Sequence, residues 1–171
     1  MTGETKKYLP VPHHGDIGTA ATFGRYYEDF EPGMILKHWP GRTITEAADH
    51  LFCLLIGNHH PLHLDSNYAA TTQFGRPVVV GNLVFETIFG MSVSDVSGKA
   101  LANLAIRSIE FLNPTFHGDT VYAHTEVLKK RHSTSKLDRG IVEVRTTGTN
   151  QRAEKVCVFE RAVMVPCRNG L

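Results

Sequence analysis

The stretch TITEAADHLFCLLIGNHHPLHLD, residues 43–65, carries most of the information in this chain. It predicts an amphipathic helix that begins with a capping box, because Thr43 and Glu46 stand three residues apart. Four apolar residues follow at helical spacing and form one stripe: Ala47, Leu51, Leu54 and Leu55. Gly57 and Asn58 both tolerate the left-handed backbone that ends many helices. The helix is therefore expected to stop there.

A dense group of hydrogen-bonding side chains follows the helix: Asn58, His59, His60 and His63. His63 is the leading candidate for proton transfer, because imidazole titrates near neutral pH without any perturbation. Two other interpretations stay open. His63 could be a structural histidine bonded to Asp65, or His60, His63 and Asp65 could bind a metal ion. The spacing matches no standard zinc pattern, so we expect no metal.

The bulk properties of the chain exclude several classes of protein. Its 171 residues suffice for one domain with a single substantial core, and its net charge of +1 predicts no strong attraction to nucleic acid or to an anionic membrane. The longest apolar runs are too short for a membrane span, and the first residues lack the apolar segment of a secretory signal. The three cysteines do not have the spacing of a metal site. The sequence therefore predicts a cytoplasmic protein whose cysteines stay reduced.

The pattern along the chain predicts an α+β fold. Residues 1–24 are rich in Gly, Pro, Thr and His and predict a flexible N-terminal arm, followed by a single domain over 25–171. Residues 34–44 predict a short strand that ends in a turn at Pro40 and Gly41. Residues 83–96 are apolar almost all round, which is typical of a buried helix.

The second half of the chain predicts a β-sheet. Residues 104–112 alternate as a half-buried strand does, and three longer strands follow at 120–130, 140–150 and 155–165. Their short connections favour an antiparallel meander. The natural arrangement is a sheet that curls around the buried helix.

Four motifs in their order resemble those of the MaoC-like dehydratases, a family of hot-dog proteins that includes the (R)-specific enoyl-CoA hydratases. They are TITEAAD, GNHHPLHLD, YAATTQFGRPVVVGN and FLNPTFHGDTVYAHTEV, and the resemblance spans roughly residues 33–166. It implies an antiparallel sheet wrapped around a long central helix. It also implies a homodimer or higher homo-oligomer, with an acyl-CoA thioester site between subunits. No cofactor is implied, since CoA is part of the substrate.

The resemblance is incomplete at the catalytic motif, which usually has the sequence Gly-Asp-x-Asn-Pro-Leu-His. Four residues match it: Gly57, Pro61, Leu62 and His63. Asn58 stands where the family has its catalytic aspartate, and His60 stands where it has asparagine. An amide can orient a water molecule but cannot act as a base near neutral pH. We therefore expect His63 to be the base, His60 to be the second candidate, and Asn58 to hold the water or the substrate.

The family further implies a substrate-binding group at the start of the central helix. Gly81 matches the position whose backbone N–H stabilises the enolate-like thioester oxygen, and a helix N-terminus favours such negative charge. Asn82 could add a side-chain contact. Arg76 could pair with a CoA phosphate or a substrate carboxylate, or it could form a surface ion pair.

The expected function is that of a hydro-lyase, an enoyl-CoA hydratase that adds water reversibly to a short acyl-CoA. The Asn58 and His60 variant resembles the branch of the family that handles small branched or dicarboxylic groups such as mesaconyl- or itaconyl-CoA. Two alternatives stay open. One is a hot-dog thioesterase with Glu86 on the central helix as its acidic residue. The other is a catalytically silent acyl-CoA-binding subunit.

Overall fold

The computed structural model describes residues 23–169 and contains one five-stranded sheet. The strands lie in the order β1-β3-β4-β5-β2, and every neighbouring pair is antiparallel. Their bounds are β1 Ile35–Thr43, β2 Ala102–Phe111, β3 Thr120–His132, β4 Arg139–Thr149 and β5 Lys155–Pro166. The predicted meander of the last three strands is confirmed, and β1 and β2 form the two edges of the sheet.

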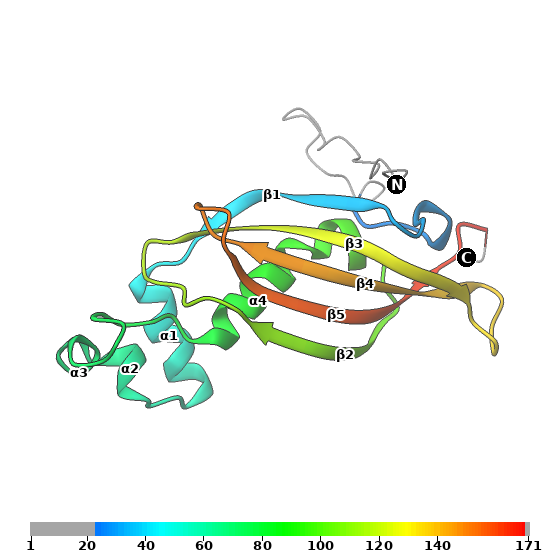
Figure 1. Ribbon diagram of the computed structural model, residues 1–171. Coiled ribbons are helices and arrows are strands. Elements are labelled where there is room, and N and C mark those ends of the chain that lie inside the picture. The colour runs from blue at the N-terminus through cyan, green and yellow to red at the C-terminus, as the bar shows by residue number, and fades with distance from the viewer. Residues whose placement is uncertain (1–22, 170–171) are drawn as a thin grey trace.

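The helices occupy two places relative to the sheet (Figure 1). Three gather at one end of it: α1 (Glu46–Ile56), α2 (Pro61–Leu64) and α3 (Ser66–Ala70). The fourth, α4 (Gly81–Met91), lies along one face of the sheet and continues into a π-helical segment, η2 (Val93–Ser97). A short 3₁₀ turn, η1 (Tyr27–Asp29), precedes β1. The α+β arrangement of a sheet around a central helix is therefore confirmed.

Helix α4 is held by apolar contacts with the sheet. Val84, Phe85 and Ile88 are buried, and the ring of Phe85 meets that of Phe159 on β5 edge to face at 5.0 Å. Gly148 on β4 lets the helix approach closely, because a Cβ at that position would lie 2.1 Å from Cδ1 of Ile88. The hydrophobic run that predicted a buried helix is thus explained by this contact.

The start of α1 differs from the predicted capping box. Thr45 is the N-cap, and its hydroxyl accepts the Ala48 N–H at 3.2 Å. Thr43 still belongs to β1, where its hydroxyl lies 2.8 Å from the Thr120 hydroxyl of β3. The predicted pairing of Thr43 with Glu46 was wrong, because the ladder with β3 holds Thr43 in an extended conformation.

Strand β1 also differs from the prediction, because it does not end at Pro40 and Gly41. It crosses a cis Trp39–Pro40 peptide and continues to Thr43. Its pairing with β3 shifts between His38 and Arg42. An edge strand with such an irregularity tolerates a proline, which lacks the N–H that a regular ladder requires.

Two apolar surfaces that the sequence predicts, the stripe on α1 and the strand β2, are exposed in the described chain. The stripe on α1 points outward, with Leu51, Leu54 and Leu55 56%, 70% and 75% exposed, whereas Asp49 and Cys53 are the buried side chains of that helix. Strand β2 was expected to be half-buried, but most of its side chains are exposed. Hydrophobic periodicity identified both elements correctly and did not reveal that these surfaces are exposed.

The predicted arm at residues 1–24 lies outside the described residues except for its last two. The Gly24 N–H donates to the Ser94 carbonyl at 2.8 Å, and Tyr27 and Phe30 just beyond are buried in the core. Within residues 23–169, no helix has the length and apolar character that crossing a membrane requires.

The close approach of α4 to the sheet can be tested at Gly148. We expect Gly148→Ala to lower the free energy of unfolding by about 1–3 kcal/mol, because the added methyl group overpacks the contact with Ile88. Urea denaturation measures this change. Gly90→Ala is the matched control, since a Cβ there meets nothing within 4 Å. Equal urea midpoints for Gly148→Ala and the parent protein would contradict the proposed contact.

Candidate active site

The loop after α1 is shaped by local hydrogen bonds of its polar side chains. Gly57 ends α1 in the left-handed conformation (φ 67°), as predicted. The Asn58 side-chain oxygen accepts the His60 N–H at 3.0 Å, and Nδ1 of His60 accepts the Leu62 N–H at 3.1 Å. His60 is therefore the N-cap of α2, with Pro61 in the first turn. These bonds fix the start of α2 at Pro61, and His63 is the third residue of this short helix.

The ring of His63 is held by a backbone carbonyl. Its Nδ1 lies 2.7 Å from the oxygen of Val78, and a carbonyl oxygen only accepts. Nδ1 therefore carries the proton, and Nε2 has the lone pair that a general base needs. Asp65 is not the partner of His63, because its carboxylate accepts the N–H groups of Asn67 and Tyr68 at the start of α3. The hypothesis of a structural His63–Asp65 pair was wrong.

His63 lines a cavity of about 360 Å³ beside the start of α4. The other residues around it are mostly apolar: Phe74, Val78, Val79, Gly81, Val84, Phe111, Leu112, Asn113, Pro114, Thr115 and Val156. Gly81 contributes the beginning of α4, and a Cβ at that position would come within 3.1 Å of the Phe111 ring. The structure therefore brings together two of the predicted residues, His63 and Gly81, in one largely apolar pocket.

The other four predicted residues do not line this cavity. His60 and Asn58 lie on the adjoining loop, and the His60 ring is centred 5.7 Å from that of His63. Asn82 is exposed on α4. Arg76 is exposed and stacks its guanidinium on the Phe116 ring at 3.9 Å, which is neither of the two roles considered for it.

Ten of the residues that line the cavity were not predicted as site residues, and two of these, Thr115 and Phe111, matter most for its chemistry and shape. Thr115 is 2% exposed, and its hydroxyl has no hydrogen-bond partner among the described residues. Phe111, at the end of β2, forms one wall. This buried hydroxyl, in the same cavity as a candidate base, is free to bond a polar atom of a ligand. No local signal in the sequence distinguishes Thr115 from an ordinary turn residue.

The segment from Val78 to Val80 connects the parts of the site. The Val78 N–H donates to the Leu62 carbonyl at 3.2 Å, and its own carbonyl holds His63. The Val79 N–H donates to the carbonyl of Thr115 at 2.8 Å. The Val80 N–H donates to the buried carboxylate of Asp49 on α1 at 3.0 Å. Each residue of the segment is thus tied to a different part of the chain.

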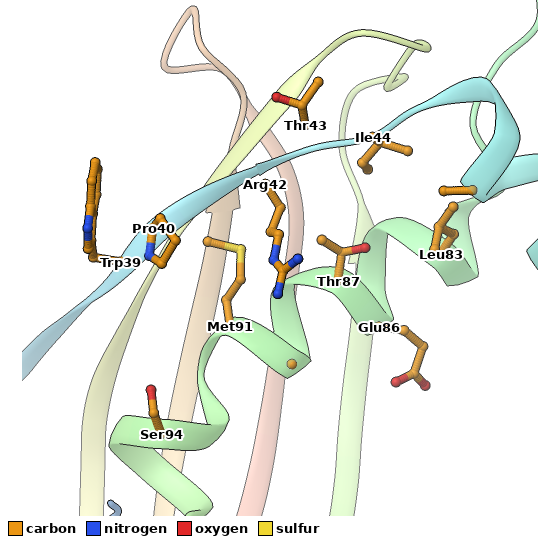
Figure 2. Close-up of a pocket in the computed structure, with 12 residues that line it drawn as sticks. Trp39, Pro40, Arg42, Thr43, Ile44, Leu83, Glu86, Thr87, Met91 and Ser94 are labelled. Atoms are coloured by element: carbon orange, nitrogen blue, oxygen red, sulfur yellow. The ribbon is translucent and has the colours of Figure 1, made fainter. Parts of the chain in front are cut away.

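A larger cavity of about 530 Å³ lies between β1 and α4. Figure 2 shows Arg42 extending from β1 toward α4, and Glu86 on the outer side of that helix. Glu86, the acidic residue considered for a thioesterase, lines this cavity and not that of His63. None of the residues that line the His63 cavity is acidic.

Neither a metal centre nor a reactive thiol is visible at the site. The described residues contain no group of three His, Cys, Asp or Glu side chains arranged to bind a metal ion. All three cysteines are free and buried. Burial raises the pKa of the Cys157 thiol to about 11, and it also raises the pKa values of Cys53 and Cys167.

The fold is shared with solved hot-dog proteins. A MaoC-domain dehydratase from Chloroflexus aurantiacus superposes with a TM-score of 0.83 and 31% identity, over 90% of this chain and 43% of that one. A protein from Mycobacterium tuberculosis with a double hot-dog fold gives a TM-score of 0.77 and 30% identity, over 85% of this chain and 45% of that one. The described chain is therefore a hot-dog domain of the MaoC-like type.

Residues 16–171 match the family model for mesaconyl-CoA hydratase, and the chain belongs to this family. The mesaconyl-CoA hydratase of Cereibacter sphaeroides is 32% identical over 85% of this chain and 42% of its own length. The (R)-specific enoyl-CoA hydratase of Aeromonas caviae is 34% identical over 67% of this chain and 81% of its own length. The chain thus spans less than half the length of the mesaconyl-CoA hydratase it matches.

The raised thiol pKa values predict that the cysteines are unreactive in the folded protein. We expect Ellman's reagent at pH 8 to titrate almost none of the three cysteines in native buffer and all three in guanidinium chloride, because burial keeps them protonated and covered. The absorbance of the released thiolate gives the count. Rapid reaction of one thiol in native buffer would contradict this description of the core.

Proposed function

We propose that this protein is a hydro-lyase that adds water reversibly to the double bond of a short enoyl-CoA thioester. The observation that carries the proposal is the shared cavity of His63 and Gly81, which combines a base with a helix N-terminus. The names of the relatives, mesaconyl-CoA hydratase and (R)-specific enoyl-CoA hydratase, support the same reaction. CoA enters as part of the substrate, and the proposed reaction requires no further cofactor.

In the proposed mechanism, Nε2 of His63 takes a proton from water while the oxygen bonds to the β-carbon of the thioester. The electron pair of the double bond moves toward the thioester carbonyl and forms an enolate. The Gly81 N–H and the positive end of α4 stabilise the developing negative charge. The protonated His63 then delivers its proton to the α-carbon, so that one water has been added and the base is restored.

Asn58 and His60 have supporting roles in this proposal. The Asn58 oxygen is already bonded to the His60 N–H, so its amide nitrogen is the group that remains to orient water. His60, the second candidate for the base, has its ring near His63, but its Nδ1 lone pair accepts the Leu62 N–H. The neutral ring therefore carries its proton on Nε2, so in this proposal His60 donates a hydrogen bond and His63 is the base. Asn82 and Arg76 are exposed, so any substrate contact they make would be with the CoA part outside the cavity.

The size and chemistry of the cavity favour a short acyl group. About 360 Å³ with mainly valine, phenylalanine and proline walls accommodates a short chain with a methyl branch. A distal carboxylate, as in mesaconyl- or itaconyl-CoA, would meet Asn113 and Thr115 as the hydrogen-bonding side chains of the wall. The family model and the named relatives support mesaconyl-CoA as the first substrate to test.

We further propose that two copies of the chain form a homodimer through β2. This strand is an edge of the sheet and exposes four large apolar side chains: Leu104, Ile106, Ile109 and Phe111. An uncovered apolar edge strand is prone to pair with another strand. Phe111 also lines the cavity of His63, so the dimer interface would adjoin the active site.

The proposal places the protein in the cytoplasm, where its free cysteines stay reduced.

The proposed hydration can be tested directly with three enoyl-CoA thioesters. With crotonyl-, mesaconyl- or itaconyl-CoA we expect the enoyl-thioester absorbance to fall without release of free thiol. His63→Ala is expected to lower kcat by about 100-fold or more, the usual contribution of a general acid–base. His59→Ala is the matched control, since His59 is exposed on the same loop and is expected to leave the rate unchanged.

Each alternative function gives a different result in this assay. Thiol release with Ellman's reagent would indicate a thioesterase. Binding of CoA esters without turnover would indicate a silent subunit, especially if Asn58→Asp then created activity. If the parent protein turns over and Asn58→Ala slows it, Asn58 takes part in the reaction.

The proposed dimer can be tested by placing a charge on the exposed face of β2. Ile109→Lys is expected to convert the protein to a monomer and to lower its activity, because a charge replaces an apolar side chain at the β2 edge next to the Phe111 wall. Size-exclusion chromatography with light scattering measures the mass. Leu137→Lys is the control, because Leu137 is 87% exposed in the loop between β3 and β4. A dimeric Ile109→Lys variant would show that the interface lies elsewhere.

A further inference from the structure

Asp49 is a buried carboxylate whose two oxygens are both occupied. It belongs to α1, and its side chain is completely buried. Oδ1 accepts the Val80 N–H at 3.0 Å, and Oδ2 lies 2.9 Å from Nε2 of His117. Burying a carboxylate costs several kcal/mol unless hydrogen bonds and charge satisfy it. The carboxylate therefore holds both partners firmly.

The amide that Asp49 holds lies directly before the start of α4. Val80 is the N-cap of α4, and its own side chain provides no capping hydrogen bond. Asp49 thus accepts, from another helix, the N-cap N–H that the third residue of a capping box would otherwise accept, and it brings a negative charge to the N-terminus of α4. The next residue is Gly81, which contributes the start of α4 to the cavity of His63.

The same short segment also sets the orientation of His63. The carbonyl of Val78 accepts the Nδ1–H of His63 at 2.7 Å, two residues before the amide that Asp49 holds. A displacement of Val80 would therefore move both the His63 ring and the Gly81 amide. Small errors in the geometry of a base or an oxyanion donor are costly to catalysis.

His117 fixes the other side of the carboxylate. It lies in the loop between β2 and β3, where its ring is 18% exposed and meets His50 of α1 edge to face at 5.9 Å. The same loop provides the Thr115 carbonyl that holds Val79. Asp119 steadies the loop by accepting the Phe116 N–H at 2.9 Å. Although burial opposes it, hydrogen bonds from Gln151 and Phe116 and the charge of Arg152 keep the pKa of Asp119 below its usual value.

We propose that Asp49, oriented by His117, is a positioning residue for the hydration reaction. It places the Gly81 amide and the His63 ring by anchoring the Val80 N–H, and it does not touch the substrate. The inference rests on the proposed function for its effect on rate. The anchoring itself can be measured without any activity.

The rate test compares two substitutions at Asp49 with one substitution at Asp95, which forms a similar Asp–His pair. Asp49→Ala is expected to lower kcat by about 10- to 100-fold while KM stays within about threefold, because the loss falls on transition-state geometry. Asp49→Asn keeps an acceptor for Val80 and is expected to retain most of the activity. Asp95→Ala is the control. Asp95 lies in the η2 segment and makes the same kind of bond to the buried His38, at 2.9 Å.

A purely structural role predicts a different pattern. In that case Asp49→Ala and Asp95→Ala would lower kcat in proportion to their losses in Tm, and this result would overturn the proposal. Equal kcat in Asp49→Ala and the parent protein would overturn it as well. If Asp49→Ala does not fold, His117→Leu tests the same anchor from the other side, with an expected loss in kcat of about threefold or more.

Amide hydrogen exchange of Val80, followed by NMR, separates this inference from the proposed function. We expect the Val80 amide to exchange at least about tenfold faster in Asp49→Ala than in the parent protein, and to be little changed in Asp49→Asn. An unchanged Val80 rate in Asp49→Ala would overturn the anchoring. If the parent protein hydrates none of the thioesters, the proposed function fails, and the exchange rates alone decide whether Asp49 anchors the start of α4.

Discussion

The backbone hydrogen bonds of the segment from Val78 to Val80 organise this protein. The three valines are buried, with exposed fractions of 9%, 2% and 5%, and they belong to no regular strand. Buried N–H groups must find partners, and these do so in three separate parts of the chain. Leu62 comes from α2, Thr115 from the β2–β3 loop and Asp49 from α1. Satisfying one short segment therefore assembles the end of the molecule where the candidate site lies.

The sheet and α4 provide the rigid frame for that assembly. Ile88 packs against Gly148 and Phe85 against Phe159, so α4 cannot shift without disturbing the core. The start of the helix then reaches the cavity at a fixed place, beside the Phe111 wall. A site built on such elements keeps its geometry before the substrate arrives, which is what stabilisation of a developing charge requires.

The predictions from sequence succeeded where the signal was local or repeated. The meander of long strands, the buried central helix and the stop of α1 at Gly57 all follow from periodicity or backbone preference. They failed where two segments compete for the same residue. Thr43 has the chemistry of a helix cap, yet pairing with Thr120 keeps it in β1. Pro40 normally ends a strand, yet β1 continues through it at the sheet edge.

The sequence predicted His63 and Gly81 as site residues from local patterns. The polar loop that follows an amphipathic helix, and a glycine at the start of an apolar helix, are each encoded over a few neighbouring residues. The sequence did not show that Val78 holds the ring of His63, that the Thr115 hydroxyl is buried in the same cavity, or that Asp49 anchors Val80. These facts join residues 15 to 31 positions apart, or place a side chain against a distant wall. Local patterns leave such contacts undetermined, because only the packing of the helices against the sheet settles which buried groups meet.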